Sequence, residues 1–124
     1  MNTQKLTQKS IEAIQNAQSL AVSRSNQQID QLHLLLALLT QQDGLIPQLI
    51  QSMGVDERAM TEETERCADA LPKVTGSGRR ADEVYVTVDV DKALTEAEEQ
   101  AKHMGDEYDS VEHLFLGLKI GRAH

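Results

Sequence analysis

The sequence predicts an all-α domain that consists of a tandem repeat of one helical motif. Three observations support this fold class. First, the chain has 124 residues, the size of one domain, and 40% of them are hydrophobic. Second, only 2% are aromatic, so the core must be built from aliphatic side chains, a composition that favours helices over strands. Third, two stretches of the chain match when the sequence is compared with itself.

The first two helices are expected within the first forty residues. The first begins near Thr7, a good N-cap residue. Its apolar periodicity ends in the polar stretch 23–28. Asp30 is the expected N-cap of the second helix. Residues 32–39 are apolar on every side of a helix, which predicts that this helix lies at the centre of the core.

Proline and glycine mark the limits of two further helices. Pro47 suits the first turn of a third helix, which Gly54 ends. Asp56 is the expected N-cap of a fourth helix, which runs to Leu71 and stops before Pro72.

The internal repeat is found by comparing residues 7–39 with residues 87–119, a shift of 80 positions. Eight of these 33 ungapped positions are identical, where chance gives about two. Asp30 also meets Ser110, and both residues are good N-caps. The identical positions are caps and apolar helix positions: Thr7/Thr87, Ala13/Ala93, Ala17/Ala97, Ala21/Ala101, His33/His113, Leu34/Leu114, Leu36/Leu116 and Leu38/Leu118.

This comparison divides the chain into a first repeat at 1–71, a linker at 72–86 and a truncated second repeat at 87–124, which together form one domain. The linker contains one proline, two glycines, one serine and two adjacent arginines, and a short extended segment is expected at 84–86. The first repeat continues into two more helices, whereas the helices that should follow Leu118 are missing, so we expect the second copy to be cut short.

The charge of the chain excludes several classes of partner. Twelve basic and 20 acidic residues give a net charge of −8, and each half of the chain carries a net negative charge. Nucleic acid and anionic membranes are therefore not expected partners. The longest apolar run, 34–39, is far too short to span a membrane, and the only cysteine, Cys67, cannot form an internal disulfide. A cytoplasmic protein is expected.

No residue pattern predicts catalysis or metal binding. A phosphate-binding loop, a nucleophile elbow and a zinc-binding helix are all missing from the sequence, and Gly76–Arg79 is interpreted as a flexible linker. His33 and His113 occupy equivalent positions, three residues after an N-cap. They could converge on a metal, but we favour the interpretation that each histidine bonds its own helix start or the linker. Cys67 lacks the spacing of a metal ligand.

Acidic residues surround the second cap of the second repeat. Asp106, Glu107 and Glu112 lie close to the expected helix N-terminus, where a negative charge is electrostatically favourable. A cation- or peptide-binding role is the alternative, but the spacing alone favours structural capping.

Five segments of the chain resemble the Clp N-terminal domain, which precedes the AAA+ modules of Clp unfoldases and disaggregases. The resemblance covers residues 4–118, and the motif GD followed by EHL is specific. The linker resembles that of the ClpB branch in particular. The segments are AQSLA (17–21), DQLHLLLALL (30–39), LIPQLIQSMGVD (45–56), LPKVTGSG (71–78) and AEEQAKHMGDEYDSVEHLFLGL (97–118).

The resemblance implies a pseudo-twofold bundle of about eight helices, of which this chain lacks the last, tethered flexibly to ATPase rings. It implies capture of unfolded or aggregated polypeptide, or of an adaptor protein, by a homohexameric parent. No cofactor is expected in the domain, and ATP is expected to bind to downstream modules. The family residues linked to substrate handling match Thr7, Thr87, Asp106 and Glu112. Thr7 and Thr87 are also expected helix caps, which is a sufficient structural role for them.

Three functions therefore remain open from the sequence. The leading hypothesis is a non-catalytic substrate-capture domain of a ClpB-type disaggregase. The second is an adaptor-docking domain of a Clp protease unfoldase, of the ClpA or ClpC type. The third, a stand-alone small enzyme or metal protein, has no support beyond His33, His113 and Cys67.

Overall fold

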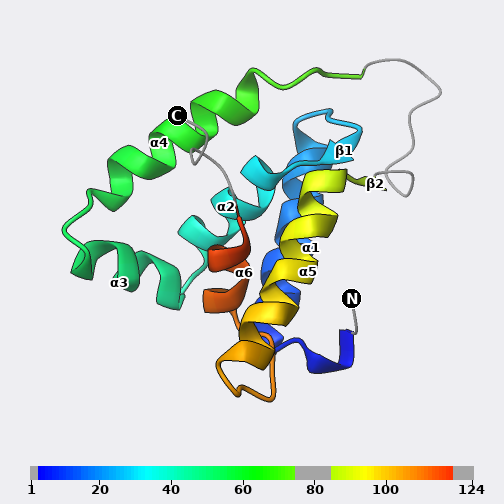
Figure 1. Cartoon of the computed structure of the whole chain (residues 1–124). Coiled ribbons are helices and arrows are strands. Elements are labelled where there is room, and N and C mark those ends of the chain that lie inside the picture. The colour runs from blue at the N-terminus through cyan, green and yellow to red at the C-terminus, as the bar shows by residue number, and fades with distance from the viewer. Residues whose placement is uncertain (1–2, 75–84, 119–124) are drawn as a thin grey trace.

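A computed structural model describes residues 3–74 and 85–118. These residues form six α-helices, a short 3-10 helix and two short strands (Figure 1). The predicted all-α repeat fold is confirmed. The predicted flexible segment Gly76–Arg79 and the chain end at 119–124 lie outside the described residues. In chain order the elements are η1 (Thr3–Lys5), α1 (Gln8–Ser23), β1 (Gln28–Ile29), α2 (Gln31–Thr40), α3 (Leu45–Ser52), α4 (Glu57–Asp69), β2 (Tyr85–Val86), α5 (Val88–His103) and α6 (Val111–Gly117).

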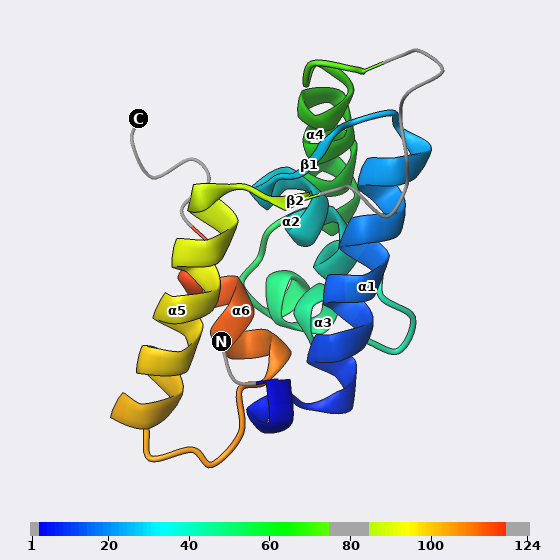
Figure 2. The ribbon, with the colours of Figure 1, turned by 90° about the vertical axis from the view of Figure 1, so that its right-hand side faces the viewer.

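The helices α1 and α5 are the equivalent long helices of the two repeats. They run in opposite directions and lie on opposite sides of the domain, with α2 and α6 between them (Figure 2). The buried face of each helix is dominated by small residues, which allow the inner helices to approach closely. On α1 these residues are Ser10, Ala13, Ala17 and Ala21, and on α5 they are Val90, Ala93, Ala97 and Ala101.

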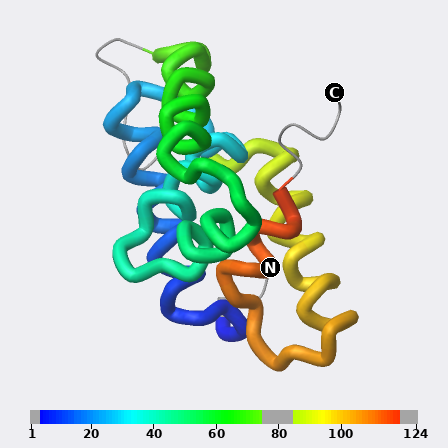
Figure 3. The backbone as a smooth tube through the Cα atoms, turned by 90° about the vertical axis from the view of Figure 1, so that its left-hand side faces the viewer, coloured from blue at the N-terminus to red at the C-terminus, as the bar shows by residue number. Residues whose placement is uncertain are grey.

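The helix α2 lies at the centre of the core, as predicted. All seven residues from His33 to Leu39 are buried. The helix packs against α1, α3, α4 and α5, and α3 and α4 cover one of its faces (Figures 1 and 3). A helix that is apolar on every side is stable only where other elements surround it, and α2 meets this condition through its neighbouring helices.

The limits of α3 and α4 follow the sequence signals closely. Pro47 lies in the first turn of α3, and Gly54 after its end has a φ of +78°, which glycine adopts without strain. The Asp56 side chain accepts hydrogen bonds from the backbone of Arg58 and Ala59 at 3.1 and 3.2 Å. The predicted extension of α4 to Leu71 is wrong, because the helix ends at Asp69.

The helix α6 packs so closely against α5 at Gly117 that a side chain would not fit there. A Cβ atom on Gly117 would lie 2.4 Å from the carbonyl oxygen of Ala93. The equivalent residue of the first repeat is Ala37, which is 1% exposed. The second repeat therefore uses a glycine where the first accommodates a methyl group.

The two repeats are joined by two equivalent backbone contacts. The strands β1 and β2 pair in parallel, with Ile29 opposite Val86, and a second parallel bridge joins Leu6 to Asp109. Residues 80 positions apart are equivalent in the two repeats, so Leu6 corresponds to Val86 and Asp109 to Ile29. In each of these contacts, the residue before the first N-cap of one repeat pairs with the residue before the second N-cap of the other repeat. The repeat boundaries at 71 and 87 remain a prediction.

Candidate functional site

Both threonines that were predicted from the sequence cap the helices that follow them. The Thr7 Oγ1 accepts a hydrogen bond from the Ser10 amide at 3.1 Å, and the Thr87 Oγ1 accepts one from the Val90 amide at 3.1 Å. The two hydroxyl groups differ in what they donate to. The Thr7 hydroxyl donates to Ser10 Oγ at 3.0 Å, and Ser10 in turn donates to the Asp109 carbonyl at 2.9 Å. The Thr87 hydroxyl donates a hydrogen bond to no described residue, because Val90 occupies the position that is equivalent to Ser10.

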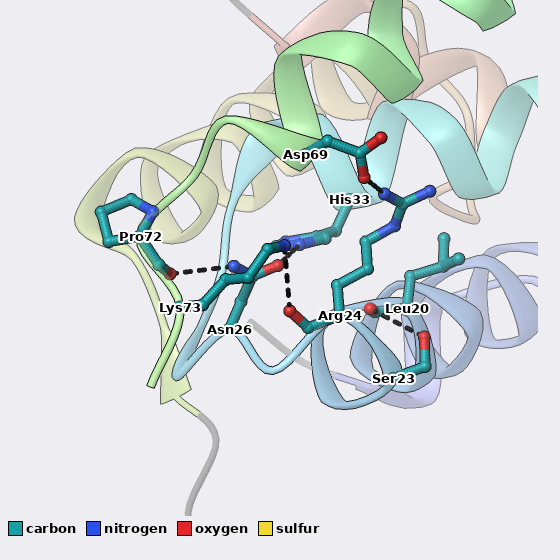
Figure 4. A network of polar contacts seen from close by, with 8 residues as sticks. All are labelled: Leu20, Ser23, Arg24, Asn26, His33, Asp69, Pro72 and Lys73. Carbon is teal, nitrogen blue, oxygen red and sulfur yellow. Dashed lines mark hydrogen bonds and ion pairs between the residues drawn. The ribbon is translucent and has the colours of Figure 1, made fainter. Parts of the chain in front are cut away.

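His33 bonds both its own helix start and, through Asn26, the linker. Its Nδ1 accepts a hydrogen bond from the Asp30 amide at 2.8 Å, so the ring proton lies on Nε2. The Nε2 group donates to Asn26 Oδ1 at 2.9 Å, and Asn26 Nδ2 donates to the Pro72 carbonyl at 2.9 Å (Figure 4). The structural interpretation of His33 is confirmed.

The protonation of His33 follows from this environment. Burial lowers the pKa of His33 below its usual range, and the positive charges of Arg24 and Lys73 act in the same direction, against the opposing charge of Asp30. Arg24 forms an ion pair with Asp69 at the end of α4, and the Lys73 amine donates to the Arg24 carbonyl at 3.3 Å (Figure 4). A neutral histidine is therefore fixed beneath the start of the linker.

His113 makes the equivalent contacts with a charged partner. Its Nδ1 accepts a hydrogen bond from the Ser110 amide at 2.9 Å, and its Nε2 lies 2.9 Å from Asp106 Oδ2. The ring is 3% exposed, whereas the Asp106 side chain is 47% exposed. Asp106 is the equivalent of Asn26, so it orients the buried ring from the surface. Glu112 lies in the first turn of α6 and accepts a hydrogen bond from Ser110 Oγ at 3.2 Å.

The four residues implied by the resemblance do not form one site. Thr7 lies beside the 106–113 segment, because its amide donates to the Asp109 carbonyl at 3.1 Å. Asp106 and Glu112 belong to this segment. Thr87 lies at the opposite end of the domain, because α1 and α5 run antiparallel (Figures 1 and 2). The helix α1 has 16 residues, so it spans about 24 Å. The two ends of the domain are separated by a distance of this order.

We call these two regions the Thr7 end and the Thr87 end. The Thr7 end comprises Thr7 and residues 106–113, and the Thr87 end comprises Thr87, residues 26–30 and residues 71–74. The Thr7 end is acidic, since Asp106, Glu107 and Glu112 are exposed. In the Thr87 end the equivalents of Asp106 and Glu107 are the uncharged Asn26 and Gln27.

The Thr87 end contains a pocket of about 430 Å³. Its apolar lining comes from Leu71, Pro72, Val74 and Tyr85, and its polar lining from Asn26, Gln27, Gln28, Asp30 and Thr87. The side-chain amides of Gln27 and Gln28 make no hydrogen bond within the described chain, and neither does the Thr87 hydroxyl proton. Three hydrogen-bonding groups and an apolar wall are thus available to a ligand in a volume typical of binding pockets.

Sequence reasoning missed most of this pocket. It selected Thr87 but not Asn26, Gln27, Gln28 or the segment 71–74. The 80-residue shift does place Asn26 opposite Asp106, which was selected. This pair consists of an amide and a carboxylate, so it is not among the identical positions of the repeat.

The described part of the chain holds neither a candidate metal cluster nor a helix that could span a membrane. Residues 3–74 and 85–118 contain no group of three or more potential ligands that could hold a metal ion. None of the described helices has the length and apolar character needed to cross a lipid bilayer.

The chain matches known proteins along nearly its full length. Residues 5–123 match the family of the Clp repeat (R) N-terminal domain. The chaperone protein ClpB of Bacillus cereus is 44% identical over 118 residues, which are 95% of this chain and 14% of the relative. The ClpB of Clostridium tetani is 37% identical over 123 residues, which are 99% of this chain and 14% of the relative. The chain thus spans about one seventh of the length of these chaperones.

Solved structures share the same fold. The N-terminal domain of Hsp104 from Candida albicans superposes with a TM-score of 0.82 at 23% identity, covering 96% of this chain and 76% of the other. The N-terminal domain of the ClpV1 ATPase from Escherichia coli superposes with a TM-score of 0.82 at 23% identity, covering 97% and 71%. The repeated helix pair, its paired histidine caps and these matches together show that the chain is a member of the Clp N-terminal domain family, related to the ClpB chaperones.

Proposed function

We propose that this chain is the substrate-binding domain of a ClpB-type disaggregase, and that it captures extended segments of unfolded or aggregated polypeptide in the pocket at the Thr87 end. The observation that supports this proposal most is the combination of an apolar wall with the Gln27 and Gln28 side-chain amides and the Thr87 hydroxyl proton, which make no hydrogen bond within the described chain. Tyr85, Val86 and Val88 extend the apolar surface beside it, with 63%, 43% and 69% of their areas exposed.

This chemistry suits a ligand without a fixed sequence. Every extended chain presents backbone N–H and C=O groups, which Gln27 and Gln28 can pair with in either orientation. Apolar side chains, which unfolded proteins expose, can rest on Leu71, Pro72 and Val74. Among the described lining residues only Asp30 is charged, and its carboxylate caps α2, so we expect little preference for basic or acidic segments. We expect binding to be weak, because one pocket of this size holds only a few residues.

The parent protein supplies what the domain lacks. We infer that the domain is non-catalytic, that ATP is bound and hydrolysed in other modules of a cytoplasmic, homohexameric parent, and that several copies of the domain hold one substrate. Linked copies raise the effective concentration of each pocket, so that avidity compensates for weak individual contacts.

The four residues implied by the resemblance receive separate roles in this proposal. Thr87 caps α5 and offers its hydroxyl proton to the bound segment. The Thr7 and Asp106 contacts to Ser10 and His113 are structural. Glu112 closes the cap of α6 through Ser110.

Binding of a labelled, permanently unfolded polypeptide tests this proposal through two exposed tyrosines. Tyr85 lines the pocket, whereas Tyr108 lies at the opposite end with a similar exposure, 63% against 53%. We expect Tyr85→Ser to weaken binding about fivefold, as the loss of one aromatic contact of about 1 kcal/mol implies. We expect Tyr108→Ser to leave the affinity unchanged in the same fluorescence-anisotropy titration.

Other outcomes would contradict the assignment. Equal affinities of the wild type and Tyr85→Ser would exclude the pocket, and a loss confined to Tyr108→Ser would move the site to the Thr7 end. No binding to the unfolded polypeptide, together with one tight complex with a folded protein, would favour the adaptor-docking function instead.

A further inference from the structure

The carboxyl group of Asp109 occupies a position that is apolar in the other repeat. Its equivalent, Ile29, belongs to the hydrophobic core. Both residues are buried, with 2% and 7% of their areas exposed. The Oδ2 atom of Asp109 is buried and has no hydrogen-bond partner within the described residues. A carboxyl group without a partner at such a position is stable only as long as it stays uncharged or is reached by water.

The backbone of Asp109 holds the N-terminal segment against the second repeat. Its amide donates to the Lys5 carbonyl at 2.7 Å, and its carbonyl accepts from the Thr7 amide at 3.1 Å and from Ser10 Oγ at 2.9 Å. The contact is equivalent to that of Ile29, whose carbonyl accepts from the Thr87 amide at 3.1 Å. One of the two junctions between the repeats therefore contains a buried titratable group, and the other does not.

Charged groups from three elements act on this carboxyl group. Burial raises the pKa of Asp109 above its usual value, and Glu98 of α5 acts in the same direction. His113 of α6, Lys5 of η1 and Lys102 of α5 act in the opposite direction. From α1 and its N-cap, the contacts to Asp109 come from the uncharged residues Ser10 and Thr7. Burial and Glu98 outweigh the cations, so the protein environment favours the neutral acid.

We propose that Asp109 is a pH-responsive latch between the two repeats, which holds the segment around Thr7 when its side chain is neutral and releases it when its side chain is ionised. The Thr87 end has no such group, because Ile29 takes the place of Asp109. Release exposes the ionised carboxylate to water at the cost of the three hydrogen bonds to Lys5, Thr7 and Ser10. The latch is independent of the binding function proposed for the Thr87 pocket.

The direction of the pH effect follows from the raised pKa. The folded domain holds the Asp109 proton more tightly than the released segment does. The stabilisation is therefore complete below the usual aspartate pKa of about 3.8, and it is lost as the pH rises through the raised value. The latch weakens towards neutral pH.

Hydrogen exchange of two equivalent amides tests the latch within one molecule. We expect the protection factor of the Thr7 amide, divided by that of the Thr87 amide, to fall as the pH rises from 4 to 7. The decrease should be about tenfold for each unit by which the pKa of Asp109 is raised. In Asp109→Asn, which keeps the shape but cannot ionise, we expect this ratio to be independent of pH.

A titration of the Asp109 carboxyl carbon by NMR in the wild-type chain decides the proposal even if the variant does not fold. A midpoint above 3.8 is expected. A midpoint at or below this value would overturn the proposal, as would a constant ratio in the wild type or the same pH-dependent ratio in Asp109→Asn.

Discussion

Leu36→Ala is expected to lower the free energy of unfolding by about 2–4 kcal/mol, because it leaves a cavity in a helix that is buried on all sides. Leu36 is 2% exposed, and α2 is enclosed by α1, α3, α4 and α5. The free energies of unfolding of the wild type and of Leu36→Ala can be measured by urea denaturation, followed by circular dichroism at 222 nm.

The repeat itself offers the matched control for this variant. Leu116 is the equivalent of Leu36 on α6, but it is 42% exposed. The described part of the chain contains no counterpart of α4 on α6. We therefore expect Leu116→Ala to cost less than about 1 kcal/mol. Equal losses for the two variants would contradict the account of α2 as the central helix.

His33→Ala is expected to lower the free energy of unfolding by about 2–4 kcal/mol as well. The change removes the side-chain acceptor of the Asp30 amide and the ring donor to Asn26 Oδ1, both of which lie beneath the linker. It also leaves a cavity, since His33 is 0% exposed. The same urea denaturation, at pH 7.5, measures the loss.

The pH dependence of stability separates the titration of His33 from its packing. Since burial lowers its pKa, the unfolded chain takes up a proton near pH 6.5 that the folded domain does not. The contribution of His33 is thus complete above this pH and is lost as the pH falls below it. Between pH 7.5 and 5 we expect the wild type to lose more stability than His33→Ala. Equal losses in both proteins would contradict a buried neutral ring.

The helical part of the fold was predictable because its signals are local. Thr7, Asp30, Asp56 and Thr87 cap helices, as their side chains and positions indicate. A cap needs only neighbours within three residues, so the sequence contains all the information. The bridge between Leu6 and Asp109 joins residues about one hundred positions apart and involves only one pair. No periodicity accompanies such a contact, which is why it could not be predicted.

The candidate site was less predictable than the fold for a related reason. The cap role of Thr87 follows from its neighbours, but the pocket beside it depends on where the segment 71–74 lies against residues 26–28. That placement is fixed by the bonds from Asn26 to Pro72 and from the Val74 amide to Ser25. These are long-range contacts of polar residues without a motif. The antiparallel course of α1 and α5, which separates Thr7 from Thr87, is likewise a tertiary property.

Chemical-shift mapping by NMR tests the central claim most directly, namely that unfolded polypeptide binds at the Thr87 end. The amide resonances of the domain are followed while a permanently unfolded polypeptide is added. We expect the largest changes at Gln27, Gln28, Val74 and Thr87, with the resonances of the Thr7 end unchanged. Changes that cluster at the Thr7 end and leave the pocket residues unaffected would contradict the account.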